Sequence, residues 1–122
     1  MTTNKEIIEK YMDGFNKSDH DQILSCLTDD VEWILPGVFH LYGKDEYDKE
    51  IENPAFEGKP IIQVTRMIEE NDVVIAEGTV RAKKKDAAFI NLVFCDVFEM
   101  RNGLIKKLAS YLMPLNNMNS IR

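Results

Sequence analysis

The chain has 122 residues, 44% of them hydrophobic and 30% charged, and its 21 acidic and 15 basic side chains give a formal net charge of −6 at pH 7. This length suits a single hydrophobic core, and the composition is that of a globular protein rather than a disordered one. The acidic balance excludes nucleic acid as an expected partner, because no basic stripe is present to neutralise phosphates.

Two short helices are predicted at the start of the chain. A capping box at Thr3-x-x-Glu6 begins the first helix, and its apolar stripe continues to about Asn16. An N-cap at Ser18-Asp19 begins the second helix, which is expected to include Leu27 on its buried side.

A short β region and a third helix follow. Residues 31–35 and 38–42 read as two strands that meet at a Pro-Gly turn. The third helix is expected to begin at Gly43, to turn Tyr47 toward the core and to end at Pro54, where the chain loses a backbone donor.

The rest of the chain is predicted to be β structure. Asn102-Gly103 is a strong hairpin signal, because a type I′ turn needs positive φ at both central residues. We therefore expect one domain over residues 1–114, followed by a poorly ordered tail at 115–122. The four long strands are expected at residues 61–69, 73–83, 87–100 and 104–113, joined as a meander.

Both faces of the third long strand are apolar. Asp96 shares one face with phenylalanines, and Val93, Cys95 and Val97 share the other. One face must cover the helices or a pocket, and the other needs a further cover that a chain of this size cannot easily supply. A homodimer formed through the sheet is the expected result.

Four short segments together indicate a fold family. They are Tyr11-x-x-x-Phe15-Asn16-x-x-Asp19, Asp29-Asp30-Val31-Glu32-Trp33, Gly43-Lys44 and Asp96-Val97-Phe98-Glu99-x-x-x-Gly103-Leu104-Ile105. In this order the chain resembles the nuclear-transport-factor-2-like superfamily, which includes SnoaL-like polyketide cyclases and ketosteroid isomerases, over residues 3–113. The resemblance implies an α+β fold: three N-terminal helices packed on a strongly curved, mainly antiparallel sheet, forming a cone with an apolar pocket, often within a dimer.

Asp96 is the leading candidate for chemistry. An acid between Phe94 and Phe98 on a pocket-facing strand would lose hydration, and this loss disfavours its charged form. Such a carboxyl group can donate a hydrogen bond to an oxyanion or act as a general acid or base near neutral pH. The alternative is a structural carboxyl group that bonds a neighbouring tyrosine or amide.

The resemblance to the isomerases also bears on Tyr11 and Leu35. Tyr11 matches the tyrosine that helps to polarise a substrate carbonyl, although it could equally be a core tyrosine. Leu35 stands where the isomerases have their catalytic base, and a leucine cannot move a proton. The match therefore argues against steroid isomerase activity and leaves open a binding or assembly module without catalysis.

Two further polar residues could replace the missing base. Glu77 interrupts an apolar strand segment, and it would pair with Asp96 if its face lined the pocket; otherwise it is a salt-bridged surface residue. His40 follows the Pro-Gly turn and could shuttle protons at the pocket rim, or could be a surface histidine without a role.

The expected ligand is a small apolar molecule, and neither a cofactor nor a metal is expected. Cys26 and Cys95 read as buried free thiols, and the two histidines lack metal-binding spacing. No apolar run approaches the roughly 18 to 20 residues that span a bilayer, so we expect no membrane partner and a cytoplasmic location. The residues expected to line the pocket and bind the ligand are Trp33, Leu35, Phe39, Phe94, Phe98 and Tyr111.

Overall fold

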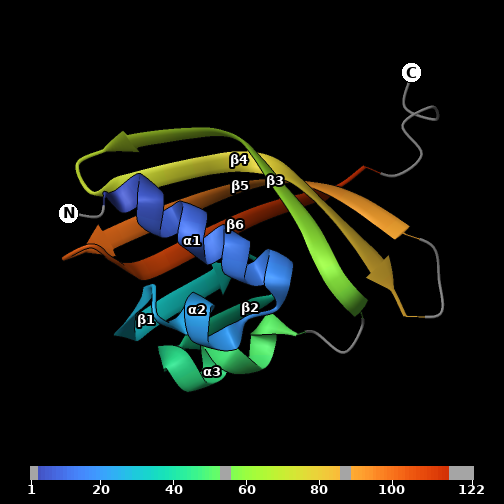
Figure 1. Cartoon of the computed structure of the whole chain (residues 1–122), viewed down its shortest axis with the longest axis horizontal. Coiled ribbons are helices and arrows are strands. Elements are labelled where there is room, and N and C mark those ends of the chain that lie inside the picture. Colours follow the sequence, from blue (N-terminus) through green and yellow to red (C-terminus); the bar gives the residue numbers. More distant parts are fainter. Residues whose placement is uncertain (1–2, 53–55, 86–88, 116–122) are drawn as a thin grey trace.

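The computed structural model describes residues 3–52, 56–85 and 89–115. Helices from the first half of the chain lie against one face of a long, bent sheet (Figure 1). The elements are α1 (Asn4–Lys17), α2 (His20–Leu24), β1 (Leu27–Leu35), β2 (Phe39–Tyr42), α3 (Gly43–Ile51), β3 (Phe56–Glu70), β4 (Val73–Lys84), β5 (Phe89–Arg101) and β6 (Leu104–Pro114).

The six strands form one sheet in the order β2-β1-β6-β5-β4-β3. The pairs are antiparallel except for β1 and β6, which run parallel. The predicted α+β architecture, with N-terminal helices on a mainly antiparallel sheet, is confirmed. The β1–β6 pairing extends the sheet past the meander, because it joins the N-terminal β1–β2 hairpin to β6.

The predicted start signals act locally as expected. Thr3 and Glu6 form both bonds of the capping box, and the buried stripe of α1 includes Ile8 and Tyr11. Asn102 and Gly103 both have positive φ, as a type I′ hairpin turn requires.

The prediction for the second helix was wrong at its end. Helix α2 stops at Leu24, and Leu27 is instead the first residue of β1, opposite Ile105 of β6. The amide of Ile105 donates to the Cys26 carbonyl at 2.8 Å, so long-range pairing with β6 outweighs the helical pattern of this segment. Pro54, the tip of the β4–β5 connection and residues 116–122 of the predicted tail lie outside the described residues.

A bulge sets which residues of β5 and β6 face each other. Their register shifts by one residue between Glu99 and Met100, so that Asp96 lies opposite Ser110. Because alternate residues point to opposite faces, this shift decides which side chains of β6 face the helices.

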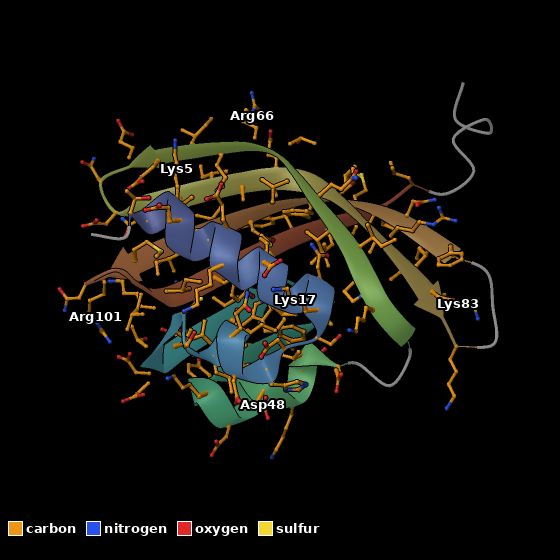
Figure 2. All side chains as sticks on the ribbon, viewed as in Figure 1. Lys5, Lys17, Asp48, Arg66, Lys83 and Arg101 are labelled. Atoms are coloured by element: carbon orange, nitrogen blue, oxygen red, sulfur yellow. The ribbon has the colours of Figure 1, made fainter. Side chains whose placement is uncertain are left out.

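The core lies between the helices and the inner face of the sheet. Phe98, Val74 and Leu108 are fully or almost fully buried there. The outer face carries Arg66, whose side chain points away from the helices in Figure 2 and binds Glu77. No helix among the described residues is long and apolar enough to cross a lipid bilayer.

Candidate functional site

Two adjacent cavities lie between the helices and the inner face of the sheet. We call the larger one, of about 410 Å³, the outer chamber, and the smaller one, of about 110 Å³, the inner chamber. They lie side by side, because they share five lining residues: Phe15, Trp33, Ile62, Val80 and Leu112.

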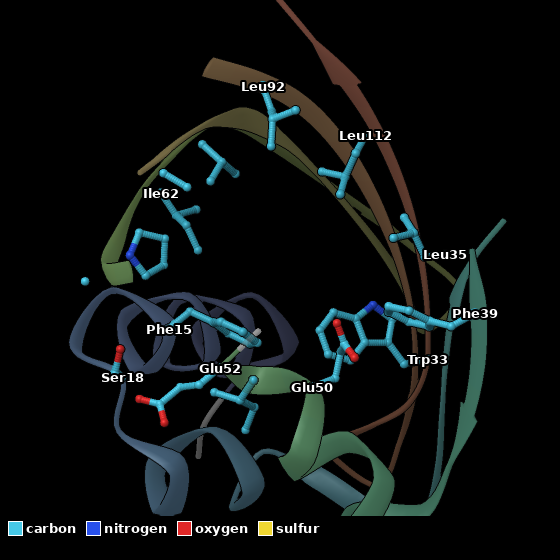
Figure 3. A pocket seen from close by; sticks show the side chains of 15 residues that line it. Phe15, Ser18, Trp33, Leu35, Phe39, Glu50, Glu52, Ile62, Leu92 and Leu112 are labelled. Atoms are coloured by element: carbon cyan, nitrogen blue, oxygen red, sulfur yellow. The ribbon is translucent and has the colours of Figure 1, made fainter. Parts of the chain in front are cut away.

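The walls of the outer chamber are mostly apolar. Leu35, Leu92 and Leu112 line its sheet side, and Phe15 lies on the helix side (Figure 3). Its charged lining residues are Glu50 and Glu52, at the end of α3. Among the described residues, no lysine, arginine or histidine lines either chamber.

Asp96 provides the acid of the inner chamber. It is only 9% exposed, and its Oδ1 is buried without a hydrogen-bond partner among the described residues. Burial raises the pKa of Asp96 to about 7, although a hydrogen bond from Ser110 acts in the opposite direction. Near neutral pH this carboxyl group therefore populates both its protonated and its ionised form.

Tyr11 lines the same chamber from α1. Its hydroxyl lies 2.5 Å from that of Tyr47 on α3, and both tyrosines are almost completely buried. Burial is the main cause that raises the pKa of each tyrosine well above its usual value, with the Asp96 charge adding to it. Both hydroxyls thus remain protonated at neutral pH; one donates in the bond between them, and the other keeps its proton for a further hydrogen bond.

Of the predicted wall residues, four line the chambers. Trp33 lines both, Leu35 and Phe39 line the outer chamber, and Phe94 lines the inner one.

The other two predicted wall residues do not reach either chamber. Phe98 is completely buried against the ring of Tyr11, with which it fills the core. Tyr111 lies opposite Cys95 on the outer face and is 53% exposed. The bulge explains the position of Tyr111, because the one-residue shift places its neighbours Ser110 and Leu112 on the inner face instead.

The structure does not bring the two candidate replacement bases to Asp96. Glu77 pairs with Cys95 across β4 and β5 and binds Arg66 on the outer face, whereas Asp96 pairs with Ala76. His40 is exposed on β2 and bonds Glu32 at 2.9 Å. The proposed Glu77–Asp96 carboxylate pair is therefore absent, and Glu77 takes its alternative role as a salt-bridged surface residue.

The sequence interpretation missed three parts of the site. Ser110 contacts Asp96 only because of the bulge, and Tyr47 meets Tyr11 across 36 residues. His20 joins Asp48 at 2.5 Å and Glu52 at 3.2 Å beside the outer chamber. The hydrogen bond to Asp48 is the main cause that raises the pKa of His20. Within the described parts of the chain, no group of three or more His, Cys, Asp or Glu side chains could hold a metal ion.

Solved structures share this fold over most of their length. An LEH-like epoxide hydrolase of M. tuberculosis is 17% identical, with a TM-score of 0.79 over 90% of this chain and 82% of that one. A putative ketosteroid isomerase of Kribbella flavida DSM 17836 is 20% identical, with a TM-score of 0.73 over 90% and 77%. An NTF2-like protein of unknown function from Burkholderia pseudomallei K96243 is 21% identical, with a TM-score of 0.85 over 93% and 92%.

At these identities the structural likeness shows the fold alone. No protein of curated function matches the chain. The model of the SnoaL-like domain, however, matches residues 8–108, which include every lining residue of the inner chamber except Ser110 and Leu112. The chain therefore belongs to the SnoaL-like domain family.

Proposed function

We propose that this SnoaL-like domain is an enzyme that performs acid–base chemistry on a small apolar carbonyl compound, with Asp96 as the group that moves the proton. The observation that carries the proposal is the Asp96 carboxyl group itself. It is nine-tenths buried in a chamber that adjoins a larger apolar cavity, and one of its oxygens has no partner among the described residues. A buried acid with a pKa of about 7 is suited to give and take protons near neutral pH.

The simplest reaction that fits is a proton shift beside a carbonyl group. The ionised Asp96 would take a proton from the carbon next to the carbonyl and return it to another carbon, so that the double bond moves. Tyr11 stays protonated in the same chamber and can donate a hydrogen bond to the carbonyl oxygen as it gains negative charge. This scheme needs no second carboxylate, which is consistent with Leu35 at the outer chamber.

The charges of the lining residues restrict the substrate. Glu50, Glu52 and Asp96 are acidic, and the described lining residues include no cation that could bind a carboxylate or phosphate. The larger chamber has the size of a small-molecule site and is lined mainly by apolar side chains. We therefore expect a neutral, largely apolar substrate.

A binding module without catalysis is the second candidate. It is favoured by Leu35, which fills the position of the isomerase base with a side chain that cannot accept a proton. In that case the same chambers would hold a ligand without changing it.

Turnover of unsaturated ketones would separate these two functions. A panel of small α,β- and β,γ-unsaturated ketones can be followed by ultraviolet absorbance with the parent protein, Asp96→Asn and Glu77→Gln. We expect Asp96→Asn to lower kcat/KM at least about a hundredfold, because general acid–base catalysis contributes on this scale.

Glu77→Gln is the matched control, because it makes the same carboxyl-to-amide change on the outer face and should leave turnover at the parent level. Full activity of Asp96→Asn would refute the role of Asp96. Saturable binding of these ketones without turnover by the parent would support the binding module instead.

We further propose that two copies associate through the outer face of β3–β6. Tyr111 is 53% and Met113 is 65% exposed on this face, and Ile68 is 50% exposed on β3. Val93, Cys95 and Val97 lie between them and are only partly covered. Exposed apolar groups of this size on one sheet face are typical of an interface, and a second copy offers the same apolar surface.

Light scattering after size exclusion tests the association. The parent is expected to have twice the mass of one chain, and a Tyr111→Glu, Met113→Glu double variant is expected to have the mass of one chain. Val38→Glu adds a charge at a residue that is 71% exposed in the β1–β2 turn, and it should leave the dimer intact. A monomeric parent, or a dimeric double variant, would contradict the proposal.

A further inference from the structure

Trp33 is held in a fixed position between the two chambers. Its ring stacks on Tyr47, with centroids 4.4 Å apart, and its edge packs against Phe39 at 5.3 Å. Its Nε1–H donates to the Ser110 hydroxyl at 3.1 Å. Because an indole nitrogen can only donate, Ser110 must be the acceptor in this bond.

Ser110 has its own proton left to donate. It is 5% exposed, so water does not readily accept this proton, and it lies directly opposite Asp96 in the β5–β6 ladder. The hydrogen bond between Ser110 and Asp96 lowers the pKa of the carboxyl group, as expected when a donor stabilises the charged form. The chain of hydrogen bonds thus runs in one direction, from Trp33 through Ser110 to Asp96.

This chain of hydrogen bonds leaves one oxygen of Asp96 without a partner in the part of the protein that the structure describes. Oδ1 is buried and has no partner among the described residues, and Asp96 lines the inner chamber. Buried carboxyl oxygens normally have a hydrogen-bond partner, so a missing partner beside a cavity marks a position for a ligand atom. A carboxyl group that turned freely about its bond would present either oxygen.

We propose that Trp33 and Ser110 are positioning residues that hold the Asp96 carboxyl group in one orientation, with Oδ1 available to a ligand in the inner chamber. This inference extends the proposed function and rests on it only for the chemical class of the ligand. The orientation itself is a property of the protein without ligand.

Titration of Asp96 in the ligand-free protein tests the inference. The side-chain carboxyl carbon of Asp96 can be followed by ¹³C NMR between pH 4 and 9 in the parent and in Ser110→Ala, Ser110→Thr and Trp33→Phe. We expect Ser110→Ala to raise the titration midpoint by about 1 pH unit, since a hydrogen bond to the charged form is lost. Ser110→Thr keeps the hydroxyl and should restore the parent midpoint.

Trp33→Phe keeps an aromatic ring but removes the N–H donor. Without this donor the Ser110 hydroxyl loses the bond that orients its proton toward Asp96, so the midpoint should again rise, by less than in Ser110→Ala. Leu92→Ala is the control for a changed chamber wall without a changed hydrogen bond, and it should leave the midpoint at the parent value.

The outcomes separate this inference from the proposed function. Midpoints that stay at the parent value in both Ser110→Ala and Trp33→Phe would overturn the inference. A shift in Ser110→Ala alone would overturn the role of Trp33. The expected shifts in a protein that turns over none of the ketones would leave the positioning role standing and remove the catalytic one. If Ser110→Ala does not fold, the titration midpoints of Asp96 in Trp33→Phe and Ser110→Thr test the inference in its place.

Discussion

Replacing Asp96 by Asn is expected to stabilise the protein increasingly as the pH rises. From pH 4 to pH 8, the free energy of unfolding of the variant minus that of the parent should increase by roughly 4 kcal/mol. The pKa of Asp96 is about 7 in the folded protein, against 3.8 for an unperturbed carboxyl group. Between these two values the unfolded chain loses its proton while the folded chain keeps it. The Asp96 contribution to the free energy of unfolding of the parent therefore falls by about 1.4 kcal/mol for each pH unit between these values and levels off above pH 7.

Urea unfolding of both proteins at several pH values measures this effect. The comparison must use the difference between the two curves, because the raised pKa of His20 also removes stability as the pH rises. His20 is present in both proteins, so its contribution cancels in the difference. Asp30, whose pKa is lowered to about 2 beside Arg101, is also present in both proteins, so its contribution cancels as well. Parallel stability curves for parent and Asp96→Asn would show that Asp96 is not a buried acid.

Substitution of Gly78 by Ala is expected to destabilise the protein by about 3 kcal/mol or more, as overpacking does in a site that cannot relax. A Cβ atom at Gly78 would lie 2.0 Å from the Gln63 backbone oxygen and 2.9 Å from the Phe94 ring. The first contact is with backbone, so β3 and β4 would have to separate. The displaced ring of Phe94 would also change the wall of the inner chamber.

Gly37→Ala is the matched control for this substitution. Gly37 lies in the exposed β1–β2 turn with φ of +80° and has no heavy atom within 4 Å of the added Cβ. Its replacement should cost only the strain of a left-handed alanine, roughly 1 to 2 kcal/mol. Thermal or urea unfolding of both variants gives the comparison. Equal losses of stability would show that the crowding at Gly78 is relieved without cost.

Local sequence signals were sufficient to predict most of the fold. The capping box at Thr3, the glycine that opens α3 and the Asn102-Gly103 turn each depend on neighbouring residues only. Such local signals cannot predict the pairing of β1 with β6, because it joins residues more than 70 positions apart. The parallel pairing and the early start of β1 at Leu27 were therefore not predictable in this way.

The candidate site depended on the register between strands. Without the bulge beside Glu99, a two-residue turn would place Asp96 opposite Ala109 and Tyr111 on the inner face. The extra residue moves Ser110 beside Asp96 and turns Tyr111 outward. The sequence thus predicted that Asp96 would face the interior, but not which residue of β6 would bind it.

The position of Glu77 was open for a similar reason. Whether it shares a face with Asp96 depends on whether the β4–β5 connection contains an odd or an even number of residues. The strand ends at this connection could not be placed to one residue from composition, and the observed register pairs Asp96 with Ala76.

The place of β6 between β1 and β5 has a consequence for synthesis of the protein on the ribosome. Residues Leu27–Ile34 are made 75 to 78 residues before their partners at Ile105–Ala109. Until these residues emerge from the exit tunnel, the β1–β2 hairpin has no strand to join, and the apolar sides of the helices have an incomplete cover. Folding of the domain is therefore expected to finish only after β6 has left the ribosome, with the slow kinetics of distant contacts.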